Sequence, residues 1–139
     1  MAGPWKNSAT GSAGSGGSTA RALTGRAGEA LAQRHLEARG LRILARNYRV
    51  ARGRSRPGGE IDLIAVEPDG TLVFVEVRVR RGCLGGGAAA SVGPAKQARL
   101  VHAARTWLAA LPRVPPCRFD VIAVDGDRVQ WLQAAFDER

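Results

Sequence analysis

Two acidic residues within apolar segments are the side chains of this sequence best suited to chemistry. Glu76 lies in TLVFVEVRVR, residues 71–80, and Asp62 lies in EIDLIAVE, residues 60–67. A strand that is apolar on both faces is typical of the centre of a sheet. A carboxylate there loses hydration at a cost of several kcal/mol unless it is paired or bound to a metal. Glu76 therefore needs a partner.

The connection between the two segments predicts that both acids are neighbours. Residues 68–70, Pro-Asp-Gly, suit a three-residue β-hairpin with glycine in the left-handed position. Glu67 then pairs with Thr71 across the turn. Counting back along both strands from that pair places Asp62 opposite Glu76. Directly opposed carboxylates repel each other, so the pair requires a cation between the two groups or a proton on one of them. A register shifted by one residue would instead place the acids on opposite faces.

A divalent metal ion is one solution to this repulsion. Hard oxygen ligands favour Mg²⁺ or Mn²⁺, and such an ion beside a phosphodiester can activate water and stabilise the charge that builds on phosphorus. In the other solution, which is structural, Glu76 pairs with Arg78 or Arg80. Asp62 would then pair with one of the arginines of residues 41–56. The residues leave both solutions open.

The pattern of apolar residues predicts the elements that position these side chains. A helix spans residues 25–39 and ends at Gly40, and a second helix spans residues 94–111. Five strands are expected, at residues 41–50, 60–67, 71–80, 118–124 and 128–136. The third strand, the second helix and the fourth strand form a crossover that makes these two strands parallel. The fold class is therefore α/β, with a mixed β-sheet flanked by helices.

Alternation along the strand at residues 71–80 assigns its side chains to two faces. Val73, Val75, Val77 and Val79 share one face, whereas Leu72, Phe74, Glu76, Arg78 and Arg80 share the other. Residues 82–93, GCLGGGAAASVG, follow this strand directly. They are expected to form a loop that is too rich in glycine to be rigid, and this loop is a candidate mobile flap.

An excess of arginine gives the chain a formal net charge of +9. Such a charge predicts a polyanionic partner, and DNA or structured nucleic acid is the leading class. Residues 41–56, here called the basic stripe, hold six arginines and no acid, although a solvated surface is the alternative interpretation. We assign phosphate contacts to seven arginines: Arg46, Arg49, Arg52, Arg54, Arg56, Arg80 and Arg99.

The ends of the chain and its cysteines carry weaker signals. Residues 1–20 are rich in Gly, Ser and Ala and predict a disordered tail, which leaves one domain at residues 21–139. The chain has no apolar run long enough to span a membrane and no apolar stretch typical of a secretory signal. We therefore expect a cytoplasmic protein without a membrane partner. Cys83 and Cys117 lack metal-ligand spacing and are interpreted as ordinary thiols. The oligomeric state stays open.

Several motifs together resemble the YraN-like uncharacterised bacterial family. They are GEALAQRHL, GLRILARNYR, GGEIDLIAV, LVFVEVRVR and PCRFDVIAV, with the helix that contains Lys96 and Arg99, and they cover residues 24–136. That family resembles a branch of the PD-(D/E)xK, restriction-endonuclease-like superfamily, which is related to Holliday junction resolvases. The resemblance implies a restriction-endonuclease-like fold with Asp62 and Glu76 as metal ligands. It also implies Glu29 as a candidate third acid, although an acid in the first turn of a helix can instead complement the helix dipole.

Arg78 departs from the superfamily pattern, which places a lysine two residues after the strand glutamate. Lysine can position or activate the attacking water, whereas arginine stays protonated and offers only charge and hydrogen bonds. Lys96 lies in the first turn of the second predicted helix, where a cation opposes the helix dipole. An anionic partner or substrate would hold it there, and a plain surface lysine is the alternative. The candidate catalytic residues are Asp62, Glu76, Arg78 and Lys96.

Three functions are compatible with these residues. In an endonuclease, Asp62 and Glu76 hold Mg²⁺ or Mn²⁺, while Arg78 steadies the scissile phosphate and the basic stripe contacts the backbone. In a nucleic-acid-binding module, the same basic surface works without chemistry, and the acids only balance arginines. In a protein-interaction factor, the charge is incidental. The sequence contains no base-recognition element, so duplex, junction, single strand and RNA all stay open as substrates.

Overall fold

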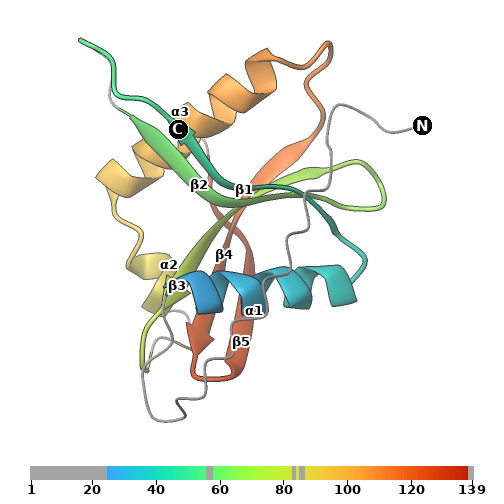
Figure 1. The fold of residues 1–139 in the computed structure, drawn as a ribbon, viewed down its shortest axis with the longest axis vertical. Coiled ribbons are helices and arrows are strands. Elements are labelled where there is room, and N and C mark those ends of the chain that lie inside the picture. Colours follow the sequence, from blue (N-terminus) through green and yellow to red (C-terminus); the bar gives the residue numbers. More distant parts are fainter. Residues whose placement is uncertain (1–24, 56–57, 83, 85–86, 138–139) are drawn as a thin grey trace.

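The described chain winds through one mixed β-sheet, and the computed structural model covers residues 25–55, 58–82, 84 and 87–137 (Figure 1). Its elements are α1 (Gly25–Ala38), β1 (Arg42–Val50), β2 (Gly59–Val66), β3 (Leu72–Val79), α2 (Gly87–Ala90), α3 (Pro94–Ala109), β4 (Cys117–Asp125) and β5 (Arg128–Phe136). The α/β fold class is confirmed, and the architecture is compatible with a restriction-endonuclease-like fold. The predicted tail, residues 1–20, lies outside the described residues.

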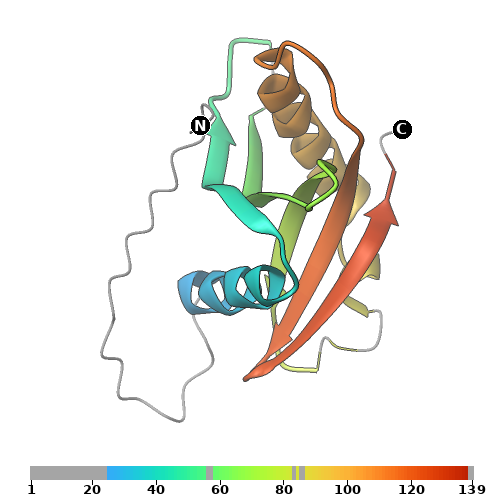
Figure 2. The ribbon, with the colours of Figure 1, turned by 90° about the vertical axis from the view of Figure 1, so that its right-hand side faces the viewer.

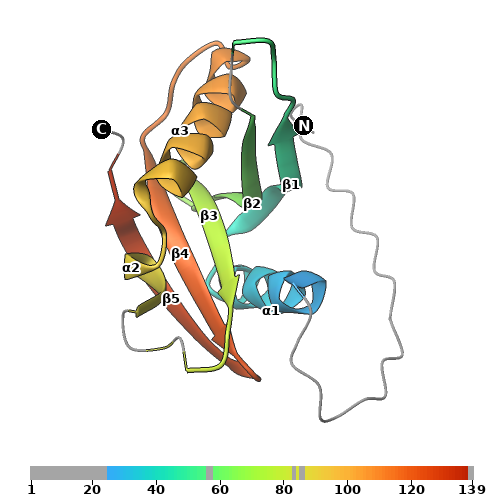
Figure 3. The ribbon, with the colours of Figure 1, turned by 90° about the vertical axis from the view of Figure 1, so that its left-hand side faces the viewer.

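The five strands lie side by side in the order β1-β2-β3-β4-β5. β3 and β4 are parallel, and the other three neighbouring pairs are antiparallel. The parallel pair is connected through α2 and α3, which confirms the predicted crossover. Figures 2 and 3 show α1 on one face of the sheet and α3 on the other. None of the helices in the described ranges is long and apolar enough to cross a membrane.

The first helix ends at Gly40, as the sequence predicts. Gly40 has φ +91°, a backbone conformation that L side chains rarely adopt. The N–H of Gly40 donates to the carbonyl of Glu37 at 3.0 Å, and the N–H of Leu41 donates to the carbonyl of Leu36 at 3.1 Å. These two bonds form a Schellman motif, in which the residue after the glycine packs back on the helix. Leu36 and Leu41 are accordingly both buried.

The approach of α1 to the sheet depends on Gly28. A Cβ atom at this position would overlap Cγ2 of Val79 on β3, so a larger residue fits only if the helix or the Val79 side chain shifts. The helix buries Gly28, Ala32 and Leu36 against the sheet. This close contact brings the next residue, Glu29, toward the end of β3 that carries the candidate site.

The hairpin between β2 and β3 has the predicted register. The N–H of Glu67 donates to the carbonyl of Thr71 at 2.9 Å, and Gly70 has φ +95°. Strand pairing runs from Val66↔Leu72 to Leu63↔Val75. The register shifted by one residue, which would have separated the two acids, is therefore excluded.

The predicted faces of β3 are confirmed. Val73, Val75 and Val77 belong to the hydrophobic cluster that includes Ala32 and Leu36 of α1. Leu72 and Phe74 belong to the opposite cluster, which includes Leu100 and Leu108 of α3. Glu76 shares the parity of Phe74, so its side chain belongs to the face that α3 covers.

The segment after β3 differs in part from the expected loop. Gly87–Ala90 forms the short helix α2, and Ala88 is buried against the α3-side core. Alanine has the highest helix propensity, and three consecutive alanines favour one helical turn over an open loop. Residues 83, 85 and 86 of the predicted flap lie outside the described residues.

Candidate active site

The strands β2 and β3 separate at Asp62. Their pairing ends at Leu63↔Val75, whereas β2 continues to pair with β1 as far as Gly59. The N–H of Val77, the next hydrogen-bonding position on β3, donates to Oδ2 of Asp62 at 2.8 Å. A carboxylate oxygen thus takes the place of a backbone acceptor. The side chain of Asp62 is held in the fork between the two strands.

Glu76 faces this fork from β3 and is almost completely buried, with a relative exposure of 3%. Its Oε2 lies 3.3 Å from Nζ of Lys96 and 3.7 Å from Nη1 of Arg78. Burial, and then the negative charge of Asp62, raise the pKa of Glu76 to about 7, although Lys96 partly opposes the shift. The predicted neighbourhood of the two acids is therefore present, and it carries the predicted electrostatic cost.

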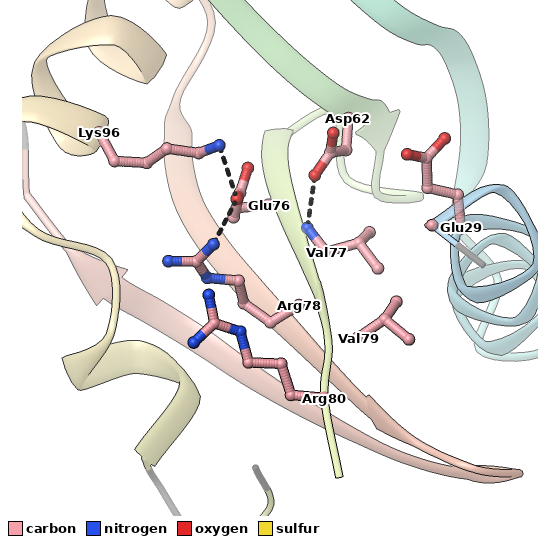
Figure 4. Close-up of a pocket in the computed structure, with 9 residues that line it drawn as sticks. Glu29, Asp62, Glu76, Val77, Arg78, Val79, Arg80 and Lys96 are labelled. Carbon is pink, nitrogen blue, oxygen red and sulfur yellow. Dashed lines mark hydrogen bonds and ion pairs between the residues drawn. The ribbon is translucent and has the colours of Figure 1, made fainter. Parts of the chain in front are cut away.

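Lys96 reaches the acids from the first turn of α3. Pro94 occupies the start of this helix, and Lys96 follows two residues later. Figure 4 shows its side chain extended toward Glu76. A cation at this end of a helix is unfavourable unless an anion compensates, and the buried carboxylate of Glu76 supplies that anion. The charge of Lys96 is thus compensated within the chain, whereas its contact with an anionic partner or substrate stays a prediction.

Arg78 has a second contact besides the one with Glu76. Its Nη2 donates to the backbone carbonyl of Ser91 at 2.8 Å, in the link between α2 and α3. The guanidinium therefore bridges Glu76 and the backbone that leads into α3. The structural alternative from the sequence, a pair between Glu76 and Arg78, is found beside the Lys96 contact. Lys96 is nevertheless the cation closer to Glu76.

These side chains line a pocket of about 320 Å³ (Figure 4). Its lining includes Glu29, Asp62, Glu76, Arg78, Arg80 and Lys96. Burial, and then the charge of Asp62, raise the pKa of Glu29, whereas a hydrogen bond from Asn47 lowers it. Glu29 lies in the second turn of α1, and the first turn holds no acid, so a role in compensating the helix dipole is weakened.

The carboxylates fit a two-ligand metal site better than a three-ligand one. Among the described residues, no group of three or more His, Cys, Asp or Glu side chains could hold a metal ion. Mg²⁺, however, commonly binds through one or two carboxylates and completes its shell with water and substrate phosphates. Asp62 and Glu76 satisfy this smaller requirement. Glu29 as a third ligand stays a prediction.

The arginines assigned to phosphate contacts are divided among several places. Arg46, Arg49, Arg52, Arg54 and Arg99 are exposed, Arg80 lines the acidic pocket, and Arg56 lies outside the described residues. Nε of Arg49 lies 3.0 Å from Oε2 of Glu60. Arg49, Arg52 and Arg99 line a second pocket of about 380 Å³ together with Glu60. No pattern in the sequence indicates that Arg99 lies in the same pocket as arginines of the basic stripe.

One buried acid was missed by the sequence analysis. Asp120 on β4 is fully buried, and its carboxylate accepts bonds from Nε of Arg118, Nε1 of Trp131 and the N–H of Ala134. Arg118 also pairs with Glu67 at the hairpin. The same signal that singled out Glu76, an acid within an apolar strand, is present in RFDVIAV. Every contact of Asp120 is internal to the fold, which gives it a structural role.

The raised pKa of Glu76 predicts how stability depends on pH. The folded protein keeps a proton on Glu76 up to about pH 7, whereas the unfolded chain releases it near pH 4.5. The free energy of unfolding should therefore fall as pH rises between these values, by roughly 1–3 kcal/mol. Urea unfolding at pH 5 and pH 8 measures this change. Glu76→Gln should remove this change, and the exposed control Glu37→Gln should keep it. If the free energy of unfolding depends equally on pH in both variants, Glu76 is not the group responsible.

Comparisons with known proteins agree on one family. The model of the Uncharacterised protein family UPF0102 matches residues 28–124, a range that contains Glu29, Asp62, Glu76 and Lys96. A UPF0102 protein of Paracidovorax citrulli is 57% identical over 128 residues, which cover 90% of this chain and 93% of that protein. A UPF0102 protein of Cupriavidus taiwanensis is 57% identical over 117 residues, covering 84% and 85%. One from Methylibium petroleiphilum is 53% identical over 113 residues, covering 81% and 93%.

Proposed function

This chain belongs to the Uncharacterised protein family UPF0102, as the YraN-like motifs predicted, and we propose that it is a metal-dependent endonuclease acting on DNA or structured nucleic acid. The observation that carries the proposal is the fork between β2 and β3. There, the buried carboxylate of Glu76 and the half-buried carboxylate of Asp62 share a pocket with Lys96. A purely structural pair of acids would gain nothing from this mutual repulsion.

Asp62 and Glu76 are the residues that would hold Mg²⁺ or Mn²⁺. When bound, such an ion activates water and neutralises charge on a phosphodiester. The hydrogen bond from Val77 fixes Oδ2 of Asp62, and the contact with Lys96 involves Oε2 of Glu76. Each carboxylate therefore has a second oxygen that these contacts do not use. The raised pKa of Glu76 supports the same role, because it stays high in spite of the contact with Lys96, and a further cation would favour the charged form of this buried carboxylate.

The basic residues of the pocket divide the remaining work. Lys96 carries the amine closest to the acids, and it orients the attacking water while it neutralises Glu76. Arg80 lines the same pocket and binds the phosphate that is cut. Arg78 steadies the link between α2 and α3 through the carbonyl of Ser91, and its charge adds to the field at the phosphate. The exposed arginines of the basic stripe contact the rest of the backbone, because phosphates dominate the affinity of nucleic-acid binding.

The metal site is tested by Asp62→Asn. In metal-free buffer this variant should melt at a higher temperature than the wild type, because it removes the repulsion with Glu76 and keeps an oxygen for the N–H of Val77. A ligand present at 100 times its dissociation constant stabilises a protein by about 2.7 kcal/mol. Excess Mn²⁺ should therefore raise the melting temperature of the wild type and of Glu37→Gln, but not of Asp62→Asn.

Calorimetric titration with Mn²⁺ provides the second readout of the same experiment. If the titration of the wild type shows no heat of Mn²⁺ binding, the metal site is refuted. Asp62→Asn that melts far below the wild type without metal would show that Asp62 is needed for structure, and the repulsion would then be absent.

A nucleic-acid-binding module without turnover is the second candidate function. Arg78 favours it, because arginine stands where the superfamily pattern has lysine and its guanidinium is bound to Ser91. The two functions share the basic surface and differ in cleavage alone. Nicking of supercoiled DNA in the presence of Mg²⁺ or Mn²⁺ separates them.

A further inference from the structure

A second pocket lies beside the pocket of Asp62 and Glu76, and cations outnumber acids in its lining. It is lined by Arg49 from β1, Arg52 from the connection to β2, and Arg99 from α3, with Glu60 as its acid. Three cations and one carboxylate leave a formal charge of +2 in a pocket of about 380 Å³. This charge matches one or two phosphate groups. Arg99 is separated in the chain from Arg49 and Arg52 by the whole β2–β3 hairpin.

The pocket is fixed by the way its segments pack. A Cβ atom on Gly59 would lie 2.7 Å from the backbone oxygen of Arg99 and 3.0 Å from Cβ of Ala103. A Cβ atom on Gly58 would lie 3.1 Å from the carbonyl oxygen of Val50. The start of β2 can therefore meet both α3 and the end of β1. This packing brings Arg99 to the basic stripe.

Glu60 orients one of the arginines without cancelling the positive charge of the pocket. Nε of Arg49 lies 3.0 Å from Oε2 of Glu60, and this contact involves one of the five N–H donors of a guanidinium. The side chain of Arg49 stays 73% exposed. An arginine held in this manner presents its remaining donors in a planar fork, the geometry that suits phosphate oxygens.

Both pockets are built on the same two elements. Glu60 and Asp62 are two residues apart on β2, a distance of about 7 Å along a strand. Lys96 and Arg99 are three residues apart on α3, which separates their Cβ atoms by about 5–6 Å. One strand of B-DNA advances about 3.4 Å per phosphate along the helix axis. The spacing of the pockets thus corresponds to one or two nucleotides.

We propose that the pocket of Arg49, Arg52 and Arg99 binds a backbone phosphate one or two nucleotides from the phosphate held at Asp62 and Glu76. This proposal rests on the proposed function, and it narrows the substrate. Productive binding requires a polynucleotide that fills both pockets, and an isolated phosphodiester or a dinucleotide fills only one. The second phosphate sets the register of the strand at the acidic pocket.

Oligothymidylates of two to eight nucleotides provide the test. Fluorescence anisotropy with the full chain should show wild-type affinity rising most steeply at the length that first fills both pockets. In Arg99→Gln that step should disappear, with a loss of roughly tenfold for the longer oligomers. The slope of log affinity against log salt should fall by about 1. Arg105→Gln, an exposed arginine on the same helix outside the pocket, provides the matched control and should keep the step.

The outcomes separate this proposal from the proposed function. Wild type that binds neither the oligomers nor a long duplex at low salt would overturn both. If the wild type binds with a salt-dependent affinity, and Arg99→Gln and Arg105→Gln reduce that affinity by the same amount, the assignment of the second pocket alone is overturned. Arg49→Gln should reproduce the Arg99→Gln result, and failure to do so also contradicts the pocket. Thermal melting of each variant verifies that the differences do not arise from unfolding.

Discussion

Replacing Lys96 by alanine is expected to eliminate metal-dependent cleavage. The loss should exceed about 100-fold, which is the usual range for removing a group that transfers or positions a proton. Nucleic-acid binding should stay within about twofold, because one phosphate contact is a small part of a charge-driven affinity. Nicking of a supercoiled plasmid and of a four-way junction, with Mg²⁺ and with Mn²⁺, measures the first effect. Anisotropy at several salt concentrations measures the second.

The physical basis of this expectation is the position of the amine. Nζ of Lys96 lies 3.3 Å from Glu76, whereas the nearest nitrogen of Arg78 lies at 3.7 Å and its Nη2 is bound to Ser91. Lys96 on α3 thus supplies the amine that Arg78 on β3 lacks. Lys96→Arg is the matched control, because it keeps the positive charge and removes the amine. It should fail to restore cleavage.

Arg78→Lys completes this experiment. If Lys96 provides the amine, the exchange at Arg78 should change the cleavage rate little. A chain that cuts only after Arg78→Lys would instead be a binding module that has lost its chemistry. Cleavage that survives Lys96→Ala would show that the amine of Lys96 is not required, and the assignment of Lys96 as a catalytic residue would then be wrong.

Local patterns in the sequence were sufficient to predict the neighbourhood of the two acids. The Pro-Asp-Gly turn determines the register, and the alternation in β3 determines the faces. Counting residues back from the turn therefore predicts that Asp62 and Glu76 are neighbours. Both rules involve residues close in the chain. The helix end at Gly40 could be predicted for the same reason, since glycine alone adopts its conformation without strain.

Features that depend on packing between distant segments could not be predicted in this way. The fork at Asp62 arises because β2 leaves β3 while it stays with β1, and no period in the sequence marks that point. The contact of Lys96 with Glu76, and that of Arg78 with Ser91, depend on how α3 lies on the sheet. The meeting of Arg99 with the basic stripe depends on the close approach at Gly59. These are the features on which the proposed chemistry rests.

The two buried acids of the central strands have opposite surroundings. Glu76 lies beside another carboxylate, and its pKa is raised to about 7. Asp120 instead accepts from three N–H groups: that of Nε of Arg118, which is shared between both carboxylate oxygens at 3.1 Å, and those of Trp131 and Ala134 at 2.8 and 2.9 Å. The bond to Ala134 also supports a residue with φ +51° on β5. A fully bonded carboxylate has a structural role, whereas the carboxylate of Glu76, crowded by Asp62, would be stabilised by the metal ion of the proposed function.

Asp120→Ala should therefore destabilise the fold strongly. The change leaves the guanidinium of Arg118 and the indole N–H of Trp131 without their buried acceptor, and removing one partner of a buried pair costs about 3–5 kcal/mol. The melting temperature should fall by about 10 °C or more. Urea unfolding at pH 7 measures the loss, and Asp127→Asn, in the exposed turn before β5, should have little effect.

The sign of the effect distinguishes the two kinds of acid. In metal-free buffer, loss of the charge at Asp62 should stabilise the protein, and loss of the charge at Asp120 should destabilise it. Asp120→Asn is the sharper comparison, because it preserves the shape of the side chain and presents an N–H₂ group to Arg118, Trp131 or Ala134, which are all donors. A stability of Asp120→Asn close to that of the wild type would show that these bonds contribute little. The distinction between a bonded structural acid and a repelled functional acid would then fail.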